Sequence, residues 1–250
     1  MTPRTRRLAP FVTVLAVGLL AACGSDTDSA STESSSSEPS TVTVTSTATP
    51  ESADEPQQQE LTKKQIHDAL PEQSDAPKGF EKDSRIAPGG TSTRETDPEK
   101  CLAVYLDTAE IREWKDKHFV ASDGVRYTQP GDAAGRASVS TFVTTYDRPV
   151  PRAFFDDAGK TVSDCGDFEE KATADSQWTA KKASNIGSPA LGDQSYSLRV
   201  GLTELDLTLD QLWVRSGHNI INIRVLAGRA DFSDETLSGM AEAVLEDLEE

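Results

Sequence analysis

Residues 211–226, QLWVRSGHNIINIRVL, consist of two largely apolar runs on either side of a short polar turn. The runs cover residues 211–215 and 220–226, and Ser216-Gly217-His218-Asn219 separates them. Gly and Asn tolerate the positive φ angles that tight turns between strands require. This stretch therefore predicts a β-hairpin, and the other elements can be placed around it.

Further strands are predicted on the N-terminal side of this hairpin. Apolar or β-branched residues alternate with mostly polar neighbours over residues 137–145 and 204–210, which is typical of half-buried strands. Weaker patterns predict strands near residues 124–129, 178–186 and 194–202. Because these runs are neighbours in the sequence, we expect them to pair in an antiparallel sheet.

Four segments have the spacing of helices. Apolar residues recur every three or four positions in residues 61–70, 152–165 and 233–248, and Ser233 is the expected N-cap of the last helix. Asp97-Pro98-Glu99 has the N-cap, first-turn Pro and early acid that begin a helix, here expected to run through Leu106. The predicted fold class is α+β: one domain, an antiparallel sheet with helices packed on one face.

The first 22 residues have the features of an export signal. Arg4, Arg6 and Arg7 precede a mainly apolar run, residues 8–22. As a helix this run is about 22 Å long, shorter than a hydrocarbon core of about 30 Å, so a permanent membrane span is not expected.

The run ends in Leu20-Ala21-Ala22-Cys23-Gly24, which resembles the lipobox of bacterial lipoproteins. The resemblance implies cleavage before Cys23 and attachment of a diacylglyceryl group to its thiol. Two acyl chains give the stable attachment that one chain does not. We therefore expect the mature chain on the outer face of the cytoplasmic membrane, anchored at Cys23. The alternative is an ordinary cleaved signal followed by an incidental cysteine.

Residues 23–60 are expected to form a disordered stalk. The segment is dominated by Ser, Thr, Pro and acidic residues and contains no aromatic residue, so it buries too little apolar surface to fold. As a flexible coil it spans roughly 30 to 35 Å. Its composition also fits O-glycosylation. The remaining residues, 61–250, have the length of one domain.

The charge of the chain excludes some partners. There are 25 basic and 42 acidic residues, a net charge of −17, and loss of the signal segment leaves 22 basic residues and a net charge of −20. Such a chain repels nucleic acid and anionic lipid, so binding to either through charge is disfavoured.

After lipidation of Cys23, the chain retains Cys101 and Cys165. An even pair of cysteines in an exported protein predicts a disulfide, which for a loop of about 64 residues contributes about 4 kcal/mol. Two buried free thiols are the alternative. A metal site is not expected, because two cysteines this far apart without a nearby His cluster lack the spacing of a ligand set.

No catalytic or cofactor-binding residue is predicted. His67 and His218 are expected to be solvated and His118 to be a paired histidine at an element's edge, and no Gly-x-Ser-x-Gly motif occurs. The acid pairs Asp156-Asp157 and Glu169-Glu170 are adjacent, so on a helix their side chains diverge by about 100° and do not form a glycosidase pair. The tryptophans and tyrosines are expected to be core residues, with a pocket lining as the alternative.

The order of four motifs resembles the extracytoplasmic sensor domain of bacterial serine/threonine receptor kinases, a domain also found alone in lipoproteins. The motifs are Asp97-Pro98-x-x-Cys101, the Phe154-Phe155 helix that ends in Asp164-Cys165, Leu191-Gly192-Asp193-Gln194, and Trp213-Val214-Arg215-Ser216-Gly217-His218-Asn219. The resemblance covers about three quarters of the chain. It implies one α+β domain with a cleft for a small ligand and no catalysis.

The chain departs from these receptors in two respects. It has no Gly-rich loop or catalytic-loop motif of a kinase, and it has one cysteine pair where the kinase sensors are expected to have two disulfides. We expect a membrane-tethered, non-enzymatic ligand-binding or sensor-like module. Its expected partners are the membrane, through Cys23, and a small ligand or envelope component. A carrier of lipid or glycolipid and a cell-wall hydrolase are the alternatives.

Overall fold

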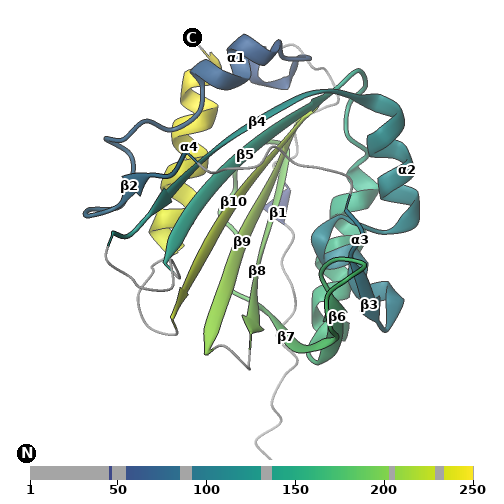
Figure 1. Ribbon diagram of the computed structural model, residues 1–250. Helices are drawn as coiled ribbons and strands as arrows, with labels where there is room; N and C mark the ends of the chain where they lie inside the picture. The colour runs from purple at the N-terminus through teal and green to yellow at the C-terminus, as the bar shows by residue number, and fades with distance from the viewer. Residues whose placement is uncertain are drawn as a thin grey trace, which may run out of the picture. The chain divides into compact units, whose positions relative to one another are not determined.

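The computed structural model describes residues 45–46, 55–84, 92–130, 137–202, 206–228 and 234–249 (Figure 1). The predicted signal segment, Cys23 and the predicted helix cap Ser233 lie outside these residues. Within the described ranges, no helix is both long and apolar enough to span a membrane.

The predicted hairpin is confirmed and lies in the middle of the sheet. Strands β9 (Leu207–Ser216) and β10 (Asn219–Gly228) pair in antiparallel register, and Gly217 in the turn has φ of +52°. Strand β8 (Gln194–Leu202) pairs with β9, and β5 (Ser138–Tyr146) pairs with β10.

The whole sheet is antiparallel, which confirms the predicted α+β class. The strand order in the described residues is β2-β4-β5-β10-β9-β8-β7-β6-β3, and a short β1 pairs with β8 beyond the end of β7. The remaining strands are β1 (Thr45–Ser46), β2 (Glu81–Lys82), β3 (Glu95–Asp97), β4 (Phe119–Thr128), β6 (Phe168–Lys171) and β7 (Thr179–Asn185).

Three of the four predicted helices are confirmed: α1 (Lys63–Asp68), α3 (Arg152–Val162) and α4 (Asp234–Glu249). The segment after Asp97 is instead a 3₁₀ helix, η2 (Glu99–Tyr105). Asp97 is not its N-cap, because Asp97 belongs to β3 and pairs with Glu169, and the Asp97–Pro98 bond is cis.

Helix α2 (Ala109–His118) was not predicted. Thr108 caps it by accepting a hydrogen bond from the Ile111 N–H at 3.3 Å. The helix buries little apolar surface: Ile111 and His118 are its buried residues, and the rest of it is largely charged. Its apolar periodicity is therefore too weak to be recognised in the sequence.

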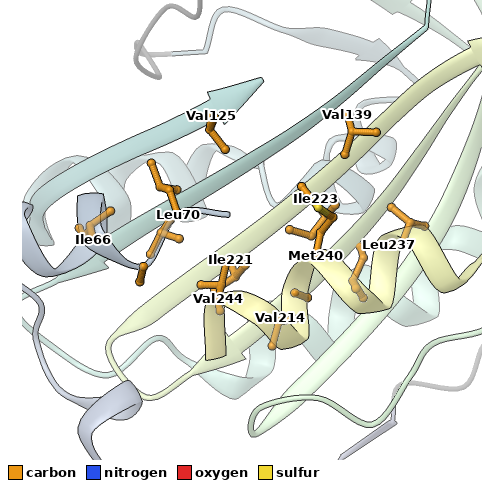
Figure 2. Close-up of a cluster of buried hydrophobic side chains, with 14 of the residues drawn as sticks. Ile66, Leu70, Val125, Val139, Val214, Ile221, Ile223, Leu237, Met240 and Val244 are labelled. Atoms are coloured by element: carbon orange, nitrogen blue, oxygen red, sulfur yellow. The ribbon is translucent and has the colours of Figure 1, made fainter. Parts of the chain in front are cut away.

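The helices occupy both faces of the sheet, whereas the sequence predicted one. Leu212 and Val214 belong to a core with α1 and α4, and Figure 2 shows Met240 and Val244 of α4 among its members. Trp213, between them in the strand, belongs to a second core with η2 and α3. Successive strand residues point to opposite faces, so the central strands are covered on both sides.

The predicted disulfide is confirmed. Cys101 in η2 and Cys165 in a short 3₁₀ helix, η3 (Ser163–Cys165), are bonded, with 5.8 Å between their Cα atoms. Both residues are fully buried in the second core, so the bond holds η2 against the end of α3.

Residues 55–60, which the sequence assigned to the stalk, pack against the tip of the hairpin. The Asn219 Nδ2 donates hydrogen bonds to the carbonyl oxygens of Gln57 and Gln59, each at 2.8 Å, and the His218 N–H donates to that of Gln58 at 2.9 Å. These residues include the 3₁₀ helix η1 (Pro56–Gln58). Hydrogen bonds to the backbone carbonyl oxygens of this segment hold it in place, and the amino-acid composition does not reveal such bonds.

Candidate functional site: a cavity between helix α2 and the sheet

A cavity of about 620 Å³ lies between α2, the segment around β3 and η2, and the second face of the central strands. Its volume is within the range of small-molecule sites. Within the hairpin, Gln211 lies directly opposite Arg224, and Trp213 opposite Asn222, so residues of β9 and β10 form its floor. Ser122 of β4 and Thr144 of β5 continue this floor.

At one wall of the cavity, acidic and basic side chains pair with one another. Asp107 accepts from both Nε and Nη2 of Arg112, each at 3.0 Å. Glu170 accepts from Arg94 at 2.7 Å and from the Tyr105 hydroxyl at 2.9 Å. Each carboxylate is therefore balanced by an arginine. Burial, together with Glu170, raises the pKa of Tyr105, which keeps its hydroxyl a hydrogen-bond donor.

The turn between η2 and α2 positions this wall. Leu106 ends η2 in the left-handed region, at φ 50°, and its side chain is fully buried. This turn places Asp107 next to Arg112 in the first part of α2. It also directs the Leu106 carbonyl to Lys115, whose Nζ donates to it at 2.7 Å. Arg112 and Lys115 are three residues apart and so share one face of α2.

Two cations of the cavity lack a carboxylate partner. In the described part of the chain, neither Lys115 nor Arg224 forms an ion pair with an acid. The Lys115 ammonium donates to Leu106, and the Arg224 Nε donates to the Asn222 side chain. Burial lowers the pKa of Lys115 to about 8 and the pKa of Arg224 to about 10. Both side chains are therefore positively charged at neutral pH.

The floor also contains buried donors without partners. Trp213 is 6% exposed and Gln211 is 2% exposed, and both line the cavity. Among the described residues, nothing accepts a hydrogen bond from Trp213 Nε1 or Gln211 Nε2. Both nitrogen atoms are themselves buried, and an unpaired buried donor costs about 1 to 3 kcal/mol, so each of them destabilises the floor in this structure.

The histidines considered in the sequence lie outside this cavity, and each has a partner. His67 pairs with Asp123 at 2.9 Å and His118 with Asp147 at 2.7 Å. The His218 ring lies 2.8 Å from the Tyr146 carbonyl oxygen. His118 is buried against Trp114 at the end of α2, as the expectation of a paired edge histidine stated.

The side chains of the adjacent acid pairs do not converge. Asp156 and Asp157 lie on helix α3, as the prediction assumed, whereas Glu169 and Glu170 lie on strand β6, where successive side chains point to opposite faces. Glu170 is buried beside Arg94, whereas Glu169 is exposed. Asp156 accepts from Gln194 at 2.8 Å, and Asp157 lies 3.8 Å from Lys160. No group of three or more potential ligands within the described ranges has the geometry of a metal site.

The aromatic residues divide between core and cavity. Tyr105, Tyr146 and Trp213 line the cavity, Tyr127 and Tyr196 are fully buried core residues, and Trp178 is 44% exposed. Sequence reasoning missed the charged residues of the site. Gln211 and Arg224 alternate with core residues on the hairpin, and this pattern does not show what covers the polar face.

A second cavity, of about 600 Å³, lies among η2, α2 and α3. Its apolar lining includes Leu102, Ile111 and Phe154, and lysines and acids surround them. One of these lysines, Lys160, is exposed and lies near Asp157. Since solvated pairs of this kind contribute little, this cavity has less capacity for selecting a charged ligand.

Two of the motifs that resemble the sensor family meet in the structure. Asp193 Oδ2 accepts from the Gly217 N–H at 2.7 Å and from Arg215 at 2.9 Å, while its Oδ1 accepts from Gln58 at 2.7 Å. Gly192 has φ of +56°, and a side chain there would collide with the Arg215 carbonyl. These motif residues therefore join the hairpin tip to the segment at residues 55–59.

Comparison with known proteins shows a shared fold. No family model and no curated protein matches the chain. The extracellular domain of PknH from Mycobacterium tuberculosis superposes with a TM-score of 0.56 at 12% identity, over 76% of this chain and 98% of that one. An uncharacterised protein from Mycobacterium smegmatis, the Rv0999 ortholog, gives 0.36 at 10% identity, over 71% and 93%. This chain therefore shares its fold with the PknH extracellular domain.

Proposed function

We propose that this chain is a membrane-anchored, extracytoplasmic module of the sensor-like type, and that its ligand binds in the cavity between α2 and the sheet. The observation that carries the proposal is the pair of cations without acidic partners, Lys115 and Arg224, in a cavity of ligand size. Both side chains are half-buried, and a partly desolvated charge without an acidic partner is costly, so its presence in a cavity favours a binding role.

Three features support the location outside the cytoplasm. The first 22 residues have the composition of an export signal and are followed by Cys23 in a lipobox-like context. The bond between Cys101 and Cys165 is of a kind that persists in oxidising compartments. The fold is that of an extracellular domain in PknH.

Binding is favoured over catalysis because Asp107, which lines the cavity, and Glu170, which pairs with the lining residue Arg94, are both engaged. The other lining acid, Asp116, is exposed. Asp107 is held by Arg112 through two hydrogen bonds, and Glu170 by Arg94 and Tyr105. The oxygen atoms of both carboxylates are therefore occupied by partners within the chain. The charged lining also favours a polar ligand over the acyl chain that a lipid carrier would bind.

Native mass spectrometry of the exported chain, extracted from membranes in mild detergent, tests the proposal. We expect a retained small molecule in the unmodified chain. Ser122→Phe, which places a ring in the cavity, should abolish retention, and Val120→Phe, at an exposed position of the same strand, should preserve it. Equal retention in both variants would place the ligand elsewhere. If the chain turns over a wall glycan or ester, and substitution of one acid or histidine abolishes this activity, the protein is a hydrolase and the proposal is wrong.

A further inference from the structure

The charge balance of the cavity is opposite to that of the chain. The full sequence has a net charge of −17. Four cationic side chains and two carboxylates line the cavity: Arg94, Arg112, Lys115, Arg224, Asp107 and Asp116. Asp116 is exposed, so the less exposed part of the lining is positive within a strongly acidic protein.

Internal pairing compensates two of these four cations. Arg112 is bound through two hydrogen bonds by Asp107, and Arg94 is bound by Glu170. The positive charge that remains belongs to Lys115 and Arg224, with which no acid of the described residues forms an ion pair.

These two cations retain free donors and lie near the same ring. An ammonium has three N–H groups and a guanidinium has five, and the hydrogen bonds described above use one of each. Lys115 Nζ is 5.8 Å from the centroid of the Trp213 ring, and Arg224 Cζ is 5.9 Å from it. A ligand that lies against Trp213 is therefore close to both charges. Their mutual repulsion contributes to the low pKa of Lys115.

The uncharged polar groups of the floor are either buried or already engaged. Trp213 Nε1 and Gln211 Nε2 have no partner in the described chain, but both atoms are buried and are not exposed to the cavity. The hydroxyl of Ser122 is engaged with the Val143 carbonyl and with Thr144. The donors available to a ligand are therefore the remaining N–H groups of Lys115 and Arg224.

We infer that the cavity binds a small organic anion, with a carboxylate or phosphoryl group between Lys115 and Arg224 and an apolar or aromatic body against Trp213. The inference rests on the proposed function, because it assigns the ligand chemistry of the same cavity. An oxyanion neutralises both cations and accepts from the free donors, whereas a cation adds to the repulsion.

Titration with four probes of one shape tests the charge that the cavity selects. Benzoate and phenyl phosphate carry the two oxyanions, benzamide is neutral and benzamidine is cationic. The readout is the indole N–H signal of Trp213 in the detergent-extracted mature chain labelled with ¹⁵N-tryptophan, assigned with Trp213→Phe. We expect the two anions to shift this signal at lower concentration than benzamide or benzamidine. The tighter of the two anions identifies the carboxylate or the phosphoryl source.

Matched variants test the two cations. Lys115→Gln and Arg224→Gln should each weaken binding of the preferred anion at least about tenfold, because each loses a charge-assisted hydrogen bond. Arg224→Lys should restore part of the affinity. Lys117→Gln on α2 and Arg148→Gln after β5, both at exposed positions, make the same charge change and should leave the affinity unchanged.

Four results decide the inference. Tighter binding of the anions, with loss only in the Lys115 and Arg224 variants, supports it. Equal or tighter binding of benzamide or benzamidine overturns the anion assignment and leaves the proposed function standing. The same conclusion follows if no probe binds and native mass spectrometry finds a retained neutral or cationic molecule. Absence of both probe binding and a retained molecule overturns the anion assignment and the proposed function together.

Discussion

Replacement of Lys115 by methionine should stabilise the protein, although Lys115 is central to the proposed site. Burial lowers the pKa of Lys115 to about 8 from an ordinary value of 10.5. The protonated side chain therefore destabilises the folded state, and at about 1.36 kcal/mol per pKa unit the cost below pH 8 is about 3 kcal/mol. The variant also loses the hydrogen bond to the Leu106 carbonyl, which reduces its gain in stability by about 1 kcal/mol. The expected net gain at pH 7 is about 2 kcal/mol.

The pH dependence has a defined sign. The unfolded chain binds a proton at this position up to its ordinary pKa, while the folded chain releases it above about pH 8. Stability contributed by this group therefore rises with pH between about 8 and 10.5 and is constant below that window. In Lys115→Met this rise is absent, so the advantage of the variant should shrink as the pH increases through the window.

Urea denaturation of the oxidised protein at several pH values between 7 and 10 measures this difference. Subtracting the variant from the unmodified chain removes the contributions of the other titrating groups. Lys117→Met, at an exposed position of the same helix, is the matched control and should change stability by less than about 0.5 kcal/mol at every pH. A destabilised Lys115→Met, or a difference independent of pH across the window, would refute the assignment of a desolvated, uncompensated ammonium.

Three further outcomes are expected. Cys101→Ser should lower the stability of the oxidised protein by about 4 kcal/mol, since it opens a loop of about 64 residues, and should have little effect in reductant; equal effects in both conditions would contradict this origin. Gly217→Ala should lower stability by at least about 1 kcal/mol and increase hydrogen exchange near Gln58, because φ is +52° and a Cβ would collide with the Gln58 carbonyl. Gly166→Ala is the control, since the space around its Cβ is open, and it should cause neither change. Cys23→Ser should release the chain from the membrane fraction or block its processing, and unchanged retention would refute lipidation.

The central part of the fold follows from local patterns. The hairpin could be predicted because its turn and its apolar runs are adjacent in the sequence. Helices α3 and α4 could be predicted because each buries an apolar stripe against a core. The short strands β2 and β3 were missed because each is only two or three residues long and pairs with a strand distant in the sequence. Strand β6 pairs with the next strand, β7, and was missed because its four residues are too few to show an alternating pattern.

The cavity could not be predicted, because its polar residues follow no local pattern in the sequence. Gln211 and Arg224 occupy strand positions that alternate with core residues, and in an isolated sheet that face would be solvated. Only the packing of η2 and α3 on this face, with α2 beside it, turns a polar surface into a cavity wall. That layer includes an unrecognised helix, so neither the cavity nor its charges could be inferred from the sequence.

The energetics of the cavity connect these observations with function. Asp107 and Glu170 are positioned so that the arginines of the wall are compensated, and the same fold leaves Lys115 and Arg224 uncompensated. Selection for stability alone would favour apolar or paired side chains at these two positions. Two cations without acidic partners in one cavity are expected where a ligand provides the negative charge, because ligand binding then offsets the repulsion between the two cations in the free protein. The predicted gain in stability of Lys115→Met and its loss of anion affinity are two consequences of the same desolvated charge.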